Sequence, residues 1–184
     1  MLNDKVKIEE GSYYHLYNRG NNRGEIFFEP KNYYYFLRQF KKHMETSCDV
    51  HAYCLMPNHF HMFVSVLDKK AFHKGIKNFF ICYSKSINKQ YDRVGSLFQG
   101  RYKAIEIKTD NYFTRIITYI HQNPLAAGLV KRLEDYKYSS YRKYFYKEPS
   151  LIKQKETLEW FNGLENLITE HQQVENILTY SKTS

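Results

Sequence analysis

The chain has 184 residues with 28 Lys or Arg and 19 Asp or Glu, which gives a formal net charge of +9 at pH 7. This length suffices for one domain with a hydrophobic core, and the basic balance favours a polyanionic partner, because clustered Lys and Arg gain affinity by releasing counterions from phosphates. We therefore expect nucleic acid as the partner, with an anionic membrane surface as the second candidate.

Cysteine usage and hydropathy narrow the expected compartment. The three cysteines, Cys48, Cys54 and Cys82, form neither a CxxC pair nor an even disulfide framework. This pattern is typical of free thiols in a reducing compartment. The N-terminus has no apolar signal region, and no run approaches the roughly 20 apolar residues of a membrane span. We expect a cytoplasmic protein that does not cross a membrane.

The first quarter of the chain predicts a strand, a basic loop and a helix. Residues 12–18 are Tyr-rich and mix apolar with polar positions, as a strand does, and residues 19–24 have a turn composition with two arginines. From 31 to 44, apolar residues recur at helical spacing with Lys and Arg between them. This pattern predicts an amphipathic helix that packs on a flat surface.

The middle of the chain predicts a hairpin, a second helix and a last strand. Two strand-like runs, 50–55 and 59–66, are joined by three residues, which is short enough for an antiparallel hairpin. Residues 71–89 have the apolar periodicity of a helix with lysines among the other positions. After a loop bracketed by two glycines, alternation returns over 102–107 and predicts the last strand.

The predicted order is strand, helix, strand, strand, helix, strand. It is typical of the split βαβ or ferredoxin-like arrangement, an α+β fold with an antiparallel sheet and helices on one face. A third helix is predicted from 111 to about 120, with Asp110 as its N-cap, because a carboxylate can accept a free backbone N–H of the first turn. Pro124 predicts a kink or an end of this helix nearby.

The C-terminal part predicts a helical tail. Beyond Pro149, apolar residues at helical spacing predict one or two amphipathic helices that either close the core or bind another protomer. The basic, polar stretch 141–155 is the linker candidate. We therefore divide the chain into a main domain, residues 1–145, and a helical C-terminal extension, residues 146–184.

His59 and His61 lie at the start of the third predicted strand. Side chains alternate across a strand, so both imidazoles point to one face while Phe60 points to the other. Two neutral imidazoles on one face can hold a divalent metal. Taken alone, such a pair is more often two partly buried, hydrogen-bonded histidines, so a metal site needs a second supporting feature.

Tyr119 and Asn123 are four residues apart in the third predicted helix. Residues with this spacing fall on the same helix face, so a phenol and an amide can point together at the sheet and face the two imidazoles. In an ordinary helix the same spacing means a packed tyrosine and a capping asparagine. The spacing leaves both interpretations open.

Several segments, in order, resemble one family: the HUH single-tyrosine transposases, and within them the group associated with repetitive extragenic palindromes (REP). The most diagnostic is the histidine hairpin AYCLMPNHFH at 52–61. The others are YHLYNRGNNR at 14–23, GSLFQGRYK at 95–103, YIHQNP at 119–124, AGLV at 127–130 and YSSY at 138–141. The likeness spans residues 11–144. The sequence departs from it at Ala126, where relatives commonly carry a basic residue, and the tail matches no family motif.

The resemblance implies an HUH endonuclease-type fold and an enzyme that cleaves and rejoins single-stranded DNA. It implies Tyr119 as the nucleophile, which would form a 5′-phosphotyrosine link and free a 3′-hydroxyl. It implies His59 and His61 as metal ligands, with Asn123 as the third. It also implies a hairpin-forming DNA partner, bound by a monomer or a homodimer.

The metal and the phosphate contacts are further expectations. Imidazole suits the later transition metals, whereas abundance and a phosphate ligand favour Mg²⁺ or Mn²⁺, and we predict Mg²⁺ or Mn²⁺ as the cofactor. Four basic residues in or beside loops are candidates for phosphate contacts, although each can equally be a solvated charge: Arg19, Arg23, Arg101 and Lys103.

Two alternatives make different predictions. A domesticated relative that binds nucleic acid without cutting it would bind DNA without metal and would tolerate Tyr119→Phe. A metal-dependent phosphohydrolase that uses water would turn over without a covalent intermediate. The lack of a carboxylate-rich cluster in the sequence disfavours the second alternative, and the joint presence of the tyrosine, the histidines and the asparagine disfavours the first.

Overall fold

The computed structural model describes residues 7–146 and 150–183, except for the side chains at 110–111 and 174–183. The strands are β1 (Tyr13–Arg19), β2 (Cys48–Met56), β3 (His59–Val66) and β4 (Lys103–Ile107). The α-helices are α1 (Pro30–Met44), α2 (Lys69–Gln90), α3 (Asp110–Ala126), α4 (Gln154–Trp160) and α5 (Leu164–Thr183). Short 3₁₀ helices are η1 (Asn21–Arg23), η2 (Leu133–Asp135) and η3 (Tyr141–Phe145). The predicted order of the first six elements is confirmed.

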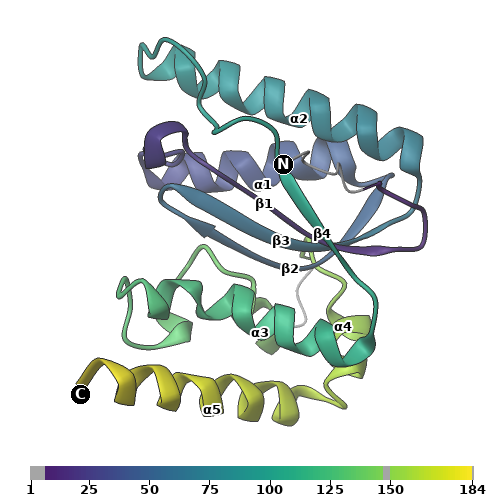
Figure 1. Cartoon of the computed structure of the whole chain (residues 1–184), viewed down its shortest axis with the longest axis vertical. Helices are drawn as coiled ribbons and strands as arrows, with labels where there is room; N and C mark the ends of the chain where they lie inside the picture. The colour runs from purple at the N-terminus through teal and green to yellow at the C-terminus, as the bar shows by residue number, and fades with distance from the viewer. Residues whose placement is uncertain (1–6, 147–149, 184) are drawn as a thin grey trace, which may run out of the picture.

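The four strands form one antiparallel sheet in the order β2-β3-β1-β4. This is the ferredoxin-like order that the split βαβ pattern predicts. Helices α1 and α2 lie together on one face, while α3, α4 and α5 lie on the opposite face (Figure 1). Among the described residues, no helix is both long and apolar enough to span a bilayer.

The α1/α2 face holds an aromatic core. Phe36 and Phe79 are fully buried, and their ring centroids lie 4.8 Å apart with the planes nearly perpendicular. Phe60 points into the same core, 5.0 Å from Phe36. Each such ring contributes about 1.5–3 kcal/mol by burial. Because Phe60 alternates with its neighbours along β3, the side chains of His59 and His61 must point to the other face.

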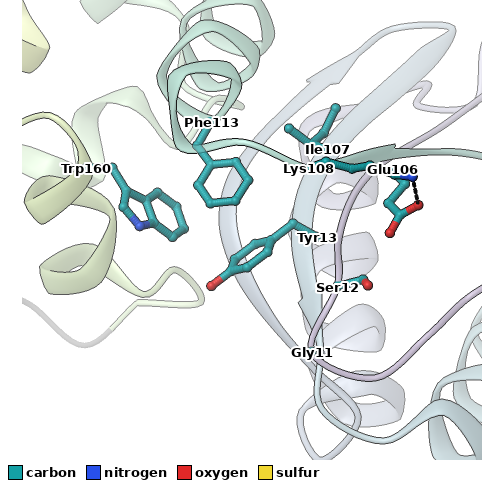
Figure 2. Close-up of a pocket in the computed structure, with 8 residues that line it drawn as sticks. All are labelled: Gly11, Ser12, Tyr13, Glu106, Ile107, Lys108, Phe113 and Trp160. Atoms are coloured by element: carbon teal, nitrogen blue, oxygen red, sulfur yellow. Dashed lines mark ion pairs between the residues drawn. The ribbon is translucent and has the colours of Figure 1, made fainter.

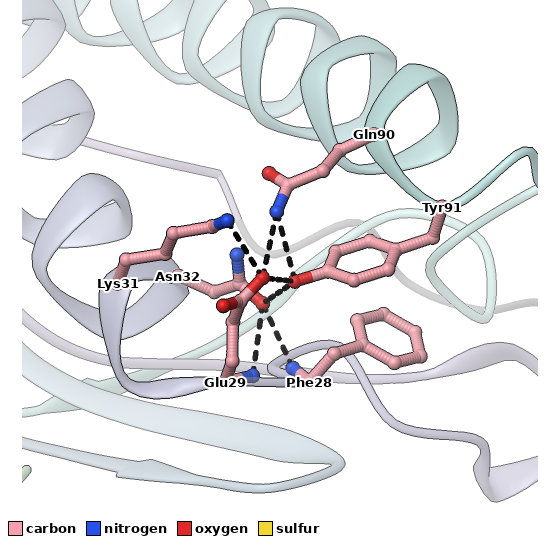
Figure 3. A network of polar contacts seen from close by, with 6 residues as sticks. All are labelled: Phe28, Glu29, Lys31, Asn32, Gln90 and Tyr91. Atoms are coloured by element: carbon pink, nitrogen blue, oxygen red, sulfur yellow. Dashed lines mark hydrogen bonds and ion pairs between the residues drawn. The ribbon is translucent and has the colours of Figure 1, made fainter.

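A polar network joins the end of α2 to the start of α1 (Figure 3). The Glu29 carboxylate accepts hydrogen bonds from the Tyr91 hydroxyl and, at 2.8 Å, from the Gln90 amide, and it pairs with Lys31 at 2.9 Å. The Asn32 side chain accepts from the backbone N–H of Glu29 at 3.1 Å and so caps α1. The network therefore fixes the first turn of α1 against α2.

Gly75 sets how closely α1 and α2 approach. A Cβ atom at this position would lie 2.3 Å from the backbone oxygen of His43 and 2.9 Å from the sulfur of Met44. We expect Gly75→Ala to lower the free energy of unfolding by about 1–3 kcal/mol through overpacking, which exceeds the gain in helix propensity of about 1 kcal/mol or less. Urea denaturation measures this change, and Lys77→Ala, on the exposed side of α2, is the matched control. A Gly75→Ala protein as stable as wild type would contradict the close contact.

Helix α3 differs in two ways from the sequence-based expectation. Its N-cap is Thr109, and Asp110 is the first helical residue, so the expectation of Asp110 as the N-cap is wrong. The helix continues to Ala126, two residues past Pro124. Proline has no backbone N–H, so the helix loses one hydrogen bond at Pro124. The Ala127 N–H still donates to the Asn123 carbonyl at 2.9 Å, which keeps the last turn closed.

The C-terminal helices complete the domain core rather than stand apart from it. α5 packs on α3, and Phe161 and Leu167 are buried there. The expected linker 141–155 is wrong in its first part, because Tyr141 and Tyr144 are buried in η3. Residues 147–149 of that stretch lie outside the described residues. Ile152 then forms an isolated parallel β-bridge with Val50 of β2, so the chain returns directly to the sheet.

Two buried histidines join α3 to α5. His121 Nδ1 lies 2.8 Å from His171 Nε2, and His121 Nε2 lies 2.8 Å from the Ser140 hydroxyl. His171 Nδ1 also lies 2.7 Å from the Leu167 carbonyl oxygen. Because the Ser140 hydroxyl also bonds the Tyr53 backbone of β2, this network ties α3 to both α5 and the sheet. It also fixes the helix that carries Tyr119.

Stability should fall in mild acid because these histidines are buried in the neutral form. Burial lowers the pKa of His171 to about 4, and burial with the neighbouring His171 places the pKa of His121 well below its usual value. A lowered folded-state pKa means that the stabilisation is complete above pH 6.5 and is lost as pH falls toward 4, because the unfolded chain takes up the protons first. For His171 alone the loss is about 3 kcal/mol.

Urea denaturation at a series of pH values between 7.5 and 4 measures this effect. We expect His171→Gln to flatten the dependence of the unfolding free energy on pH, since it removes one of the titrating groups. His73→Gln, at an exposed position on α2, should keep the wild-type dependence. Equal slopes for all three proteins would rule out the buried pair as a source of acid sensitivity.

Candidate active site

The β2–β3 hairpin and strand β1 position the two histidines of the candidate site. His59 opens β3 opposite Arg19, and His61 lies opposite Tyr17 on β1. The two imidazole centroids are 5.1 Å apart with the ring planes nearly perpendicular. His61 is 7% exposed, and His59 is half-buried. The structure therefore brings both imidazoles together on the α3 face of the sheet, as strand alternation predicts.

Each histidine has one ring nitrogen held by a neighbour. His59 Nδ1 lies 2.7 Å from Asn58 Oδ1, and His61 Nδ1 lies 2.8 Å from His15 Nε2. Because each Nδ1 is engaged, Nε2 is the nitrogen that each ring presents to the site. Such outer partners fix the tautomer and the ring orientation of a metal-binding histidine.

Burial keeps these imidazoles neutral. It lowers the pKa of His61 to about 3, with the neighbouring His15 and His59 adding to the effect, and it lowers the pKa of His15 to about 4. Burial also lowers the pKa of His59, against a hydrogen bond to Asn123 that acts the other way. Because these pKa values are lowered, both rings are neutral at neutral pH. The neutral imidazole is the form that binds a metal.

Helix α3 directs Tyr119 and Asn123 at the same place. The Tyr119 ring meets His61 edge-on with centroids 5.6 Å apart, and it meets His15 at 6.0 Å. Half of Tyr119 is exposed, so its ring is open to solvent beside the histidines. Asn123 Nδ2 donates to the Tyr119 carbonyl at 2.8 Å, and the Asn123 side chain is close enough to His59 to raise the pKa of that imidazole against the effect of burial.

The donor set fits a divalent cation. Among the described residues, no group of three or more His, Cys, Asp or Glu side chains is arranged to hold a metal ion. The two neutral imidazoles lie 5.1 Å apart between centroids instead, and the Asn123 side chain is close enough to His59 to raise its pKa. Three neutral protein donors leave coordination positions and the full cation charge for an anionic ligand.

Three loops meet at this end of the sheet. The Gly20 N–H donates to the Asn58 carbonyl at 2.7 Å, and the Asn21 N–H donates to the Leu97 carbonyl at 2.9 Å. Gly20 has no room for a side chain, because a Cβ there would lie 1.8 Å from the Gly24 carbonyl oxygen. Three motifs that are far apart in the sequence thus form one surface around His59.

The structure places two of the four candidate phosphate contacts beside the histidines. Arg19 lies opposite His59, where its positive charge lowers the pKa of His59, and its guanidinium donates to the Gln99 side chain. Lys103 lies opposite Tyr17, in the same row of the sheet as His61. Arg23 and Arg101 are exposed in the flanking loops and are not brought to the histidines in the same way.

Sequence reasoning assigned no role to His15, although the structure places it directly behind His61. The signal in the sequence was its position two residues before Tyr17 on a predicted strand, which puts both on one face. What could not be read was the pairing of β1 with β3, and this pairing brings His15 Nε2 to His61.

We expect His15→Ala to weaken metal binding and any metal-dependent activity by about 10–100-fold, because His61 would lose its orienting partner. His15→Gln can place an acceptor at the position of Nε2 and should recover part of the loss. Calorimetric titration with Mn²⁺ measures the affinity for the metal. An alanine variant with wild-type affinity, or a glutamine variant no better than alanine, would contradict this positioning role.

Comparisons with known proteins bear on this site. The sequence profile of the family described as "Transposase IS200 like" matches residues 9–123, which is more than half of the chain and includes all four central site residues. The chain belongs to the family of IS200-like transposases. No curated protein matches this chain. The expectation of the transposase family is therefore confirmed.

A solved structure adds the fold of this transposase. It is described as "Structure of the REP associates tyrosine transposase bound to a REP hairpin" and superposes with a TM-score of 0.62 at 16% sequence identity. The match covers 81% of this chain and 89% of the other. At this identity the likeness shows a shared fold, which covers most of both chains.

Proposed function

We propose that this chain is a divalent-metal-dependent transposase that cleaves and rejoins single-stranded DNA through a covalent bond to Tyr119. The observation that carries the proposal is the placement of a half-exposed tyrosine edge-on to His61, with the Asn123 side chain close to His59. A nucleophile next to a three-donor metal site is an arrangement that can carry out phosphodiester transfer.

The chemistry follows from the groups present. The Tyr119 oxygen forms a bond to phosphorus, and the bond from phosphorus to the 3′ oxygen breaks. The tyrosine gives up its proton as it attacks, and the leaving 3′ oxygen takes up a proton. DNA then remains attached as a 5′-phosphotyrosine with a free 3′-hydroxyl. The reverse step rejoins the strand without a nucleotide cofactor, because the phosphodiester bond energy is retained.

His59, His61 and Asn123 hold the metal in this proposal, and Mg²⁺ or Mn²⁺ is the ion used. The bound ion supplies Lewis-acid polarisation of the scissile phosphate. Asn58 and His15 orient the two imidazoles so that Nε2 of each points into the site. The half-exposure of Tyr119 leaves room for a strand to approach its hydroxyl.

The substrate in this proposal is single-stranded DNA that folds into a hairpin. Support comes from the net charge of +9 and from the shared fold with a transposase described as bound to a REP hairpin. Arg19 and Lys103 contact phosphates next to the scissile one, and Arg23 and Arg101 contact phosphates further along the strand. These contacts make the affinity fall as salt concentration rises.

The test is to trap the covalent intermediate. The protein is incubated with single-stranded hairpin oligonucleotides and Mn²⁺ or Mg²⁺, denatured in detergent, and examined for a protein–DNA adduct, with a chelator in the control. An adduct that needs metal and maps by mass spectrometry to Tyr119 supports the proposal. DNA binding without an adduct under every metal and substrate would instead support a non-cutting nucleic-acid binder.

A further inference from the structure

Arg19 is the last residue of β1 and carries a positive charge beside the candidate metal ligand His59. The two residues lie directly opposite each other in the antiparallel pairing of β1 with β3, so their side chains point to the same face of the sheet. Burial lowers the pKa of His59, and the charge of Arg19 adds to that effect. Within the described part of the chain, no salt bridge involves Arg19. No carboxylate there cancels its charge next to the candidate site.

The strand that carries Arg19 is joined to the helix that carries Tyr119. At the start of β1 the ring of Tyr13 packs against Phe113 of α3, with centroids 4.5 Å apart, and Phe113 packs against Trp160 of α4 at 4.9 Å (Figure 2). These contacts hold the backbones of β1 and α3 together. They leave free the long side chain of Arg19, which has several rotatable bonds and is exposed.

The loop at 97–100 runs beside the end of β1 and brings Gln99 next to Arg19. Phe98 is buried and forms an antiparallel bridge with Gly20. The backbone N–H of Gln99 donates to the Arg19 carbonyl at 2.9 Å. The position of the Gln99 backbone is therefore set by its pairing with β1.

Asn18 ties the same two segments together. Its side chain is buried, and its Oδ1 accepts from the Arg19 backbone N–H at 2.9 Å while its Nδ2 donates to the Gly100 carbonyl at 3.2 Å. Gly100 has a φ of 73°, which glycine adopts at no steric cost, so the chain turns directly after Gln99. Gln99 and Arg19 thus lie on two segments whose relative position is fixed by hydrogen bonds.

The side chains of Gln99 and Arg19 also meet. The Gln99 side-chain oxygen accepts a hydrogen bond from Nε of Arg19. A guanidinium carries its N–H donors in a rigid planar fork, and this bond uses the one on Nε, which leaves both Nη groups for another acceptor. Because glutamine is neutral, it fixes the plane of the guanidinium without cancelling the charge, as a carboxylate would do.

We propose that Gln99 is a positioning residue that holds the Arg19 guanidinium so that its two Nη groups bind the DNA phosphate next to the scissile one. The inference rests on the proposed function, which supplies the DNA strand. Two parallel N–H donors fix the orientation of a phosphate as well as its distance. A phosphate held opposite His59 in this way sets where the neighbouring scissile phosphate lies relative to Tyr119. Without Gln99, Arg19 still attracts DNA but no longer orients it.

Gln99→Met tests this role, because methionine has a similar length and no strong acceptor for Nε. We expect the rate of adduct formation at saturating DNA to fall about ten-fold, since a small misplacement of the reacting groups lowers the rate steeply. The Kd for DNA should change by about two-fold or less, because the charge of Arg19 remains. Quenched time courses of adduct formation and fluorescence anisotropy measure the two quantities.

Arg19→Met should behave differently, because it removes the charge itself. We expect this variant to weaken DNA binding and to reduce the slope of log Kd against log salt concentration by about 0.7, the contribution of one phosphate contact on a single strand. In the Arg19→Met protein, Gln99→Met should have no further effect on the rate, since a residue that acts only through Arg19 has nothing left to position. Gln99→Glu keeps an acceptor for Nε and should recover part of the rate.

Gln172→Met, at an exposed position on α5, is the matched control and should keep the wild-type rate and affinity. Equal losses from Gln99→Met with and without Arg19 would show that Gln99 contacts DNA directly and would overturn the inference. A wild-type rate for Gln99→Met, or a Gln99→Glu protein no faster than Gln99→Met, would overturn it as well. In these cases the adduct of the wild-type protein remains, and the proposed function stands. If wild type forms no adduct, the proposed function fails and this inference fails with it.

Discussion

Tyr119→Phe should abolish formation of the covalent DNA adduct and lower strand cleavage on the order of 10⁴-fold or more, as loss of a nucleophile does in other enzymes. The phenyl ring keeps the edge-on contacts of Tyr119 with His61 and His15, so the site should keep its shape. Because Tyr119 is half exposed, the free energy of unfolding should change by no more than about 0.5 kcal/mol. Affinity for single-stranded DNA should be retained. Detergent-resistant adduct formation and cleavage of labelled DNA measure the effect.

Tyr17→Phe is the informative comparison, because Tyr17 is the other tyrosine close to His61. Its ring centroid lies 5.8 Å from that of His61, nearly as close as Tyr119 at 5.6 Å. Tyr17 lies on the sheet itself and stacks against both His15 and His61, whereas Tyr119 reaches the site from α3. We expect the Tyr17→Phe protein still to form the adduct. An adduct that disappears with Tyr17→Phe and persists with Tyr119→Phe would exchange the two roles and refute the proposed nucleophile.

His59→Ala should remove saturable binding of Mn²⁺ and lower metal-dependent cleavage by more than about 100-fold, since loss of a direct ligand exceeds the usual cost of losing an outer partner. His59 is the better choice than His61, because it is half-buried, whereas His61 is buried against His15. Replacing His61 would leave His15 without its partner and confuse metal loss with misfolding. Calorimetric titration with Mn²⁺ and the cleavage assay give the two readouts.

The matched control for His59→Ala is His73→Ala, which removes an imidazole from the exposed side of α2. It should leave both metal affinity and cleavage at the wild-type level. Asn123→Ala should lie between the two, because it removes the amide donor and leaves both imidazoles. Full metal binding by the His59→Ala protein would show that the ion, if used, is held elsewhere.

Much of the candidate site could be predicted locally. Strand alternation placed His59 and His61 on one face, and helical spacing placed Tyr119 and Asn123 together, because both rules depend only on residues close in sequence. The predicted α2 and β4 begin within two residues of the observed elements. The start of α3 was missed, because the choice between Thr109 and Asp110 as N-cap depends on backbone angles at the turn.

The positions of the remaining site groups could not be predicted locally. His15 meets His61 only through the register of β1 with β3, which spans 46 residues of sequence. The buried tyrosines of η3 stood in a stretch whose polar composition is typical of a linker, but α3 and α5 provide the surface that buries them. Burial of this kind depends on elements that are distant in the sequence.

The sequence by itself determined the order of elements, the face of each histidine, the shared side of Tyr119 and Asn123, and the family motifs. These follow from periodicities of two and 3.6 residues and from residue types in fixed order. Only the tertiary structure decided that α3 lies across the sheet from α1 and α2 and that His15 holds the His61 imidazole. The physical reason is that strand pairing and helix packing join residues far apart in the chain, and these contacts set distance, burial and pKa in the site.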